Sequence, residues 1–140
     1  MFNKNYEQRL ELWSEFRDSL EDSDDPFREV IDYYEQAPYV SIHTDPWTRE
    51  AWPTPWELIY ENQYDDFCRV LGWCYSLQLT DRFKGSNFEI HIITNEETSY
   101  QYLLFVDDIV LGYTDDEAIH RRNLPSNLHS QRAYSMSGQQ

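Results

Sequence analysis

Hydrophobic positions recur at helical spacing in two stretches near the start of the chain, and charged residues fill the opposite face of each stretch. The first stretch covers residues 5–21. The second begins at Pro26, because proline is common at the first position of a helix, and it ends before Pro38. We therefore predict two short amphipathic helices. Their apolar stripes are Tyr6, Leu10, Trp13, Phe16 and Leu20 in the first, and Phe27, Val30, Ile31 and Tyr34 in the second.

The clearest helix start lies at residues 54–57, where Thr-Pro-Trp-Glu matches a capping box: threonine at the cap, proline next, and glutamate three residues after the cap. The helix is predicted to run toward residue 79, and Asn62 is a place where it could reset. Its apolar stripe, which includes Phe67 and Leu71, is broad. We therefore expect this helix to be covered on much of its circumference and to be central.

Three strand patterns follow, over Phe88–Thr94, Tyr100–Val106 and Ile109–Tyr113, and Asp107-Asp108 has the length of a hairpin loop. A run of helices followed by a run of strands favours segregated layers over β-α-β units. The predicted fold class is therefore α+β, with N-terminal helices and a long central helix packed on a three-stranded antiparallel β-meander.

The chain after the third predicted strand carries weaker signals. Thr114-Asp-Asp-Glu117 matches a second capping box, which predicts about two turns of helix up to Arg122. The residues that follow are polar and show no periodicity. We predict one acidic domain over residues 1–122 and a polar C-terminal tail over residues 123–140. Cutting the chain after Asn123 is then expected to leave the domain folded.

Charge limits the classes of partner. The 140 residues include 26 acidic and 11 basic ones, for a net charge of −15, and such a surface would repel nucleic acid. All the acids fall within residues 1–117, whereas residues 118–140 carry three arginines. The acidity serves solubility, docking on a basic partner, or imitation of the charge of DNA. The carboxylates best placed for imitation lie along one face of the first helix: Glu7, Glu11, Glu15, Asp18 and Asp22.

Groups that could bind a metal or act in catalysis are few. Cys68 and Cys74 have no zinc-type spacing and are expected to be buried reduced thiols. The run His43-Thr44-Asp45 either orients a histidine through a carboxylate or forms an Asx turn before Pro46. No serine lies in a nucleophile motif, and no glycine-rich loop is present to bind phosphate.

One pair on the predicted meander has a spacing that could serve chemistry. Glu89 and His91 point the same way from one strand, but a strand face directed toward water explains them more simply. Asp107 and Asp108 are explained by the hairpin turn. We therefore predict no catalytic residue, no metal and no cofactor. A metal-dependent hydrolase or nuclease that uses Glu89, His91 and Asp107 or Asp108 is kept as an alternative.

Aromatic residues are the best candidates for an interface. Trp47, Trp52 and Trp56 lie close together in a proline-rich stretch, and Trp, Tyr and Arg dominate interface hot spots. Proline stiffens such a loop and lowers the entropy lost on docking. We expect Trp56 to face the core, whereas Trp47 and Trp52 either fold inward or meet a partner. The candidate interface residues are Trp47, Arg49, Trp52, Arg121, Arg122 and Tyr134.

Several short stretches resemble those of a known group of proteins. They are Asp45-Pro46-Trp47, Trp-Pro-Thr-Pro-Trp-Glu-Leu-Ile from Trp52, Gly-Trp-Cys-Tyr-Ser-Leu-Gln-Leu-Thr from Gly72, and Phe-Glu-Ile-His-Ile from Phe88. Over about residues 45–113 the chain resembles small uncharacterised acidic proteins of large-genome tailed bacteriophages, marine types included. The resemblance implies a viral source and no assigned activity.

These observations predict a non-enzymatic bacteriophage protein that acts through protein–protein contacts, as a virion structural or assembly component. Its expected partners are other phage proteins or further copies of itself. No apolar run could span a bilayer, and residues 1–20 lack a signal-peptide pattern. The expected location is the virion or the host cytoplasm, without direct binding of nucleic acid or membrane. The alternatives are an acidic inhibitor that mimics nucleic acid on a host protein, and the hydrolase or nuclease named above.

Overall fold

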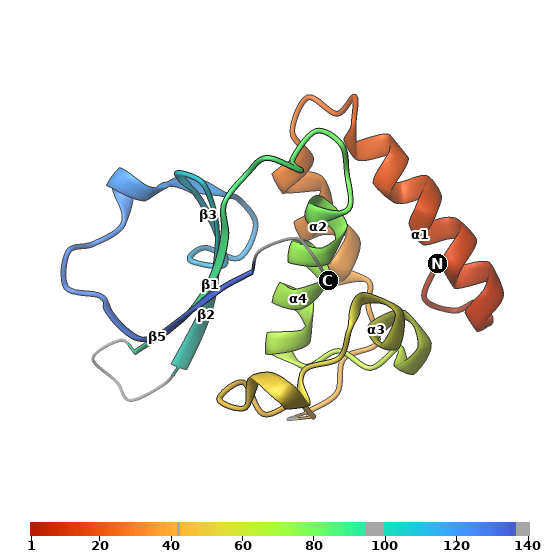
Figure 1. The fold of residues 1–140 in the computed structure, drawn as a ribbon, viewed down its shortest axis with the longest axis horizontal. Coiled ribbons are helices and arrows are strands. Elements are labelled where there is room, and N and C mark those ends of the chain that lie inside the picture. Colours follow the sequence, from red (N-terminus) through yellow and green to blue (C-terminus); the bar gives the residue numbers. More distant parts are fainter. Residues whose placement is uncertain (42, 95–99, 137–140) are drawn as a thin grey trace.

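A computed structural model describes residues 1–41, 43–94 and 100–136 of the chain. The helices gather on one side of an antiparallel sheet, and α4 lies between the sheet and the other helices (Figure 1). A capping side chain begins each α-helix, as predicted for Thr54. The helices are α1 (Tyr6–Leu20), α2 (Pro26–Glu35), α3 (Pro55–Glu61) and α4 (Asp66–Gln78).

The long central helix predicted from residue 54 to residue 79 is in fact two helices. Asn62 adopts a left-handed conformation with a φ of 53° and ends α3. Asparagine tolerates this conformation better than most residues. The break lets Tyr64 pair with an extended segment, because its N–H donates to the Pro38 carbonyl and its carbonyl accepts from the Val40 N–H. The single long helix is therefore wrong, and the reset at Asn62 is confirmed.

The α+β class is confirmed, but the described sheet has five antiparallel strands in the order β4-β3-β2-β1-β5. The predicted three-stranded meander is its centre. Asp107 and Asp108 form the hairpin turn, with Asp107 at a φ of 53°, and the third strand ends before Gly112. The strands are β1 (Phe88–Thr94), β2 (Tyr100–Val106), β3 (Ile109–Leu111), β4 (Ile119–His120) and β5 (His129–Ser135).

The last described residues form an edge strand, which corrects the predicted tail. β5 pairs with β1, and the N–H of Met136, which is 1% exposed, donates to the Phe88 carbonyl at 2.8 Å. An edge strand with largely exposed side chains needs no apolar alternation, so the pattern of β5 carried no strand signal. The tail expected over 123–140 is therefore wrong for residues 129–136, and 137–140 lie outside the described residues.

The segment between β3 and β5 covers the sheet face opposite the helices. It holds β4 and a short 3-10 turn (Arg121–Asn123), and the helix predicted from Thr114 to Arg122 is absent there. The Thr114 hydroxyl donates to the Glu117 carbonyl, so the motif closes a turn. On this face of the sheet lies a second apolar cluster, separate from the main core. It comprises Ile93, Leu103, Phe105 and Val110, with Tyr113, Ile119, Leu124 and Leu128 packed against it.

The main core lies between the helices and the inner face of the sheet. Phe67 and Leu71 of α4 are buried in it, as predicted. Trp56 was expected to face this core but is 49% exposed, because the buried stripe of α3 runs through Leu58 and Ile59. No helix of the described part is long and apolar enough to cross a membrane.

Candidate functional site

A cavity of about 290 Å³ opens between α2, α4, the start of β2 and the loop after β3, and we call it the aromatic groove. Gly112 lies at its edge with a φ of 103°, and a Cβ there would stand 2.6 Å from the Tyr102 carbonyl oxygen. Only glycine permits this close approach. The Gln101 side chain holds the loop by donating to the Gly112 carbonyl at 2.7 Å. The residues that define the groove are Glu35, Asp66, Arg69, Trp73, Tyr100, Tyr102 and Asp115.

Carboxylates outnumber cations around the groove. Glu35, Asp66 and Asp115 line it, and none of the three forms an ion pair among the described residues. Arg69 is the one cation among the lining residues. Burial, and then the neighbouring carboxylates, raise the pKa of Tyr102. The groove is therefore a site of negative potential with aromatic walls.

Two donors in the groove wall lack partners. The Arg69 guanidinium lies 5.1 Å from the centre of the exposed Tyr39 ring. Nε of Arg69 and the indole N–H of Trp73 are buried and have no hydrogen-bond partner within the described part of the chain. An unsatisfied buried donor costs about 1–3 kcal/mol.

The proline-rich loop adds a tryptophan beside the groove. Trp47 is 38% exposed and meets Tyr100 edge to face, with ring centroids 5.3 Å apart. Asp45 orders the turn, because its carboxylate accepts from the Trp47 N–H at 2.9 Å and from the Thr48 hydroxyl at 2.6 Å. The Asx turn is therefore confirmed, and Trp47 remains open to a partner.

Three other interface candidates stack beside this loop. Trp52 is 6% exposed, and its ring centroid lies 4.8 Å from that of Phe67 and 4.7 Å from that of Tyr134. The Arg49 guanidinium lies 4.6 Å from the Trp52 ring centre. The Tyr134 hydroxyl donates to the Trp47 carbonyl at 3.3 Å. Trp52 thus belongs to the core, while Tyr134 joins β5 to the loop.

The remaining two candidates lie away from the groove. Arg121 and Arg122 follow β4, in the segment that covers the outer face of the sheet. The Arg121 side chain donates to the Asp107 carbonyl at 3.2 Å, and its guanidinium lies 4.7 Å from the centre of the Phe105 ring. The structure therefore brings Trp47, Arg49, Trp52 and Tyr134 together and leaves these two arginines apart from them.

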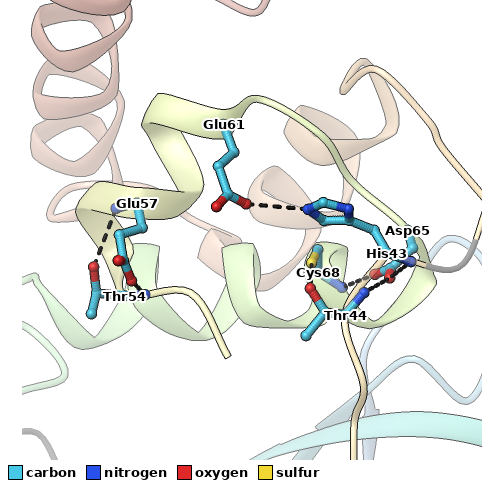
Figure 2. Close-up of polar contacts among 7 residues, drawn as sticks. All are labelled: His43, Thr44, Thr54, Glu57, Glu61, Asp65 and Cys68. Atoms are coloured by element: carbon cyan, nitrogen blue, oxygen red, sulfur yellow. Dashed lines mark hydrogen bonds and ion pairs between the residues drawn. The ribbon is translucent and has the colours of Figure 1, made fainter. Parts of the chain in front are cut away.

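One buried carboxylate fixes the loop to α4 (Figure 2). Asp65 accepts hydrogen bonds from the His43 and Thr44 N–H groups at 2.8 and 2.9 Å, and from the Cys68 N–H at 2.7 Å. The Thr44 hydroxyl also lies 3.2 Å from Cys68 Sγ. Asp65 is therefore both the N-cap of α4 and the anchor of the segment that leads to Trp47.

The His43 ring points toward the end of α3 in Figure 2. Its Nε2 lies 3.3 Å from Glu61 Oε1, so Glu61 is its carboxylate partner and Asp45 is not. Both side chains line a polar cavity of about 210 Å³ together with Glu50 and Glu57. Catalysis by an imidazole needs a nucleophile or a substrate proton within hydrogen-bond reach. No nucleophile bonds to this ring among the described residues.

A second histidine bridges β1 and β5 on the outer face. His91 Nε2 bonds to Glu89 Oε1 and its Nδ1 to Ser130 Oγ, each at 3.0 Å, and the first bond lowers the pKa of Glu89. A Ser-His-Glu relay can activate a serine, but acyl transfer also needs oxyanion donors. Neither the aromatic groove nor the polar cavity beside His43 is lined by these residues. Asp107, grouped with them in the hydrolase alternative, accepts from the Asn87 N–H instead.

The described residues form neither a cluster of metal ligands nor an exposed thiol. No group of three or more His, Cys, Asp or Glu side chains converges there to hold an ion. Cys68 and Cys74 are buried and unpaired, as predicted. Burial raises the pKa of the Cys68 thiol to about 12 and raises that of Cys74 as well. Neither thiol is therefore a nucleophile near neutral pH.

Comparisons with known protein families, with curated proteins and with solved structures gave no match to this chain. The resemblance to bacteriophage proteins stays a prediction. The functional argument therefore rests on the geometry and charge of the aromatic groove.

Proposed function

We propose that this chain is a non-enzymatic interaction protein that binds a basic segment of a protein partner in the aromatic groove. One observation carries the proposal: aromatic walls and three carboxylates without ion-pair partners among the described residues surround one cavity. A cation over Trp or Tyr gains about 0.5–2 kcal/mol, and carboxylates add charge-assisted hydrogen bonds.

The size of the groove limits its ligand. Its volume of about 290 Å³ lies at the lower end of ligand pockets, which measure roughly 300–1,000 Å³. It therefore suits a single side chain better than a cofactor. Arginine suits it best, because a planar guanidinium stacks on aromatic rings and bonds to a carboxylate with two parallel donors. Trp47, beside Tyr100, would cover the neighbouring residue of the bound segment.

The charge of the whole chain supports the same kind of partner. A net charge of −15 attracts a basic segment over a distance and raises the association rate. Salt screens such attraction over about 10 Å at 0.1 M. Binding through the groove should therefore weaken as the salt concentration rises.

Calorimetry with a short arginine-containing peptide tests the proposal. The matched ligand control replaces arginine by citrulline, which keeps the shape and removes the charge. Asp66→Asn should weaken arginine-peptide binding about 3–10-fold, because one charge-assisted hydrogen bond is lost. Glu7→Gln, which removes a carboxylate from the exposed side of α1, should change it little. Equal binding of both peptides, or equal binding to both variants, would contradict the proposal.

The resemblance to tailed-bacteriophage proteins supports placing this interaction in a virion or in its assembly. The partner would then be another phage protein with an exposed arginine. Mass spectrometry of purified virions and of assembly intermediates tests this placement. Absence of the chain from both would remove the virion role and leave the binding proposal in place.

A nucleic-acid mimic is the second candidate, and the row of exposed acids on α1 is the observation behind it. Glu7, Glu11 and Glu15 are all exposed along the helix. At 1.5 Å per residue they stand about 6 Å apart along the axis. One DNA strand carries a phosphate about every 3.4 Å. The helix thus offers about half that charge density, which favours docking on a basic protein over imitation of DNA.

A further inference from the structure

β5 has one open edge. It pairs with β1 on one side, and no strand of the described residues pairs with its other side. The Met136 N–H donates to the Phe88 carbonyl, and backbone groups along a strand alternate in direction. Those of Tyr134 therefore also point to β1, whereas those of Ala133 and Ser135 point outward. The edge presents unpaired donors and acceptors to any strand that approaches it.

Charge and side-chain size distinguish this edge from the rest of the chain. Residues 118–136 contain no acid, whereas residues 1–117 carry all 26. Ala133 and Ser135 are small and exposed. A second copy can therefore approach here without bringing carboxylates together, and like charges placed opposite each other across strands are what disfavours pairing.

We propose that two copies of the chain pair through β5, antiparallel about a two-fold axis at Ala133. In this register Ala133 faces Ala133 of the second copy, and Arg132 faces Tyr134 of the second copy. The Arg132 guanidinium already lies 5.5 Å from the centre of the Tyr134 ring in its own chain, so the two-fold axis places two such Arg–Tyr pairs side by side. The bulge opposite Ile92 and Ile93 limits regular pairing to the C-terminal half of β5. The sheets of the two copies then join into one continuous sheet. This pairing does not involve the aromatic groove and goes beyond the proposed function.

A charge exchange at Ala133 tests the pairing. Ala133→Asp places two carboxylates opposite each other across the axis, and Ala133→Lys places two ammonium groups there. Each variant alone is expected to be monomeric by light scattering, while an equimolar mixture of the two regains the mass of a dimer. Because Ala133 is exposed, both variants should keep the far-ultraviolet circular dichroism spectrum of the parent chain, which shows that they fold. Ser126→Asp, an equal charge change at another exposed position, should leave the dimer intact.

The salt dependence separates this inference from the proposed function. Two copies with a charge of −15 each repel one another, so the dimer should strengthen as salt screens that repulsion. Binding of an arginine peptide should weaken over the same range, and Asp66→Asn should leave the dimer unchanged. A parent chain that is monomeric at every concentration overturns the pairing. So do dimers that persist in both Ala133 variants, or a mixture that stays monomeric.

Discussion

The ring of Tyr34, on α2, lies directly against Gly72 of α4. A Cβ added at residue 72 would stand 2.6, 2.8 and 2.9 Å from three atoms of that ring. The ring cannot shift freely, because the Tyr34 hydroxyl lies 3.0 Å from Ser76 Oγ and Ser76 also accepts from the Trp13 indole N–H. Tyr34 lines the aromatic groove as well. The absent side chain of Gly72 therefore fixes the distance between two helices that position the groove.

Gly72→Ala should destabilise the fold in spite of the better helix propensity of alanine. Overpacking a core costs about 1–3 kcal/mol, and the propensity gain is about 1 kcal/mol. Three ring atoms within 3.0 Å place the cost in the upper part of its range, so we expect a net loss of about 1–2 kcal/mol. Gly85→Ala is the matched control, since nothing lies within 4 Å of its Cβ position. Urea unfolding measures the stability of both variants. An unchanged midpoint for Gly72→Ala would show that α2 and α4 can move apart to accept the methyl group.

Asp65→Ala should affect both stability and binding. The substitution removes the N-cap of α4, worth about 1 kcal/mol, and leaves the His43 and Thr44 N–H groups without their acceptor. We expect a loss of about 2–4 kcal/mol in a denaturant titration. The released loop should also lower peptide affinity through Trp47. Asp65→Asn keeps an acceptor oxygen and is expected to retain part of the stability and part of the peptide affinity. If Asp65→Ala and Asp65→Asn lose the same stability and affinity, the carboxylate is not the anchor.

A chain that ends at Leu128 should lose its cooperative fold. The truncation removes β5 and Met136, exposes the ladder edge of β1 and uncovers Trp52, which Tyr134 now contacts. Circular dichroism during heating should show a broad transition or none. A truncated chain that melts within a few degrees of the full chain would show that the domain ends before β5.

Stability should fall at alkaline pH. Burial raises the pKa of Cys68 from 9.0 to about 12 and that of Tyr33 from 10.0 to about 12. The folded chain holds these protons more tightly than the unfolded chain, so this stabilisation is complete below the unfolded pKa values and is lost between about pH 9 and pH 12. Tyr33→Phe should show a smaller decline across that window. Denaturant midpoints at a series of pH values measure the difference. A parent chain of constant stability there would contradict the burial of these groups.

The elements that local chemistry defines were predictable, and those that depend on distant contacts were not. The capping box at Thr54 and the alternation in Phe88–Thr94 and Tyr100–Val106 located their elements. β5 was missed, because its pairing with β1 determines the strand and its own side chains are mostly exposed. The helix expected after Thr114 failed because the same residues can close a turn as well as cap a helix.

The groove itself was missed, since it is assembled from four separate parts of the chain. One signal was available: Tyr100 and Tyr102 alternate with Gln101, so both rings fall on one face of β2. Arg69 and Trp73, four residues apart on α4, likewise share a helix face. That the two faces meet across a cavity depends on the packing of α4 on the sheet, which no local pattern encodes.

The indole N–H signals in an NMR titration with the arginine-containing peptide test the central claim most directly. Trp73 lines the groove and Trp47 stands beside it, while Trp13 is buried with its N–H bonded to Ser76. The account predicts that the Trp73 and Trp47 signals shift together and saturate at one peptide concentration, and that the Trp13 signal stays in place. Shifts confined to Trp56, which contacts Trp13 of α1, would instead place the peptide on that helix and contradict binding in the groove.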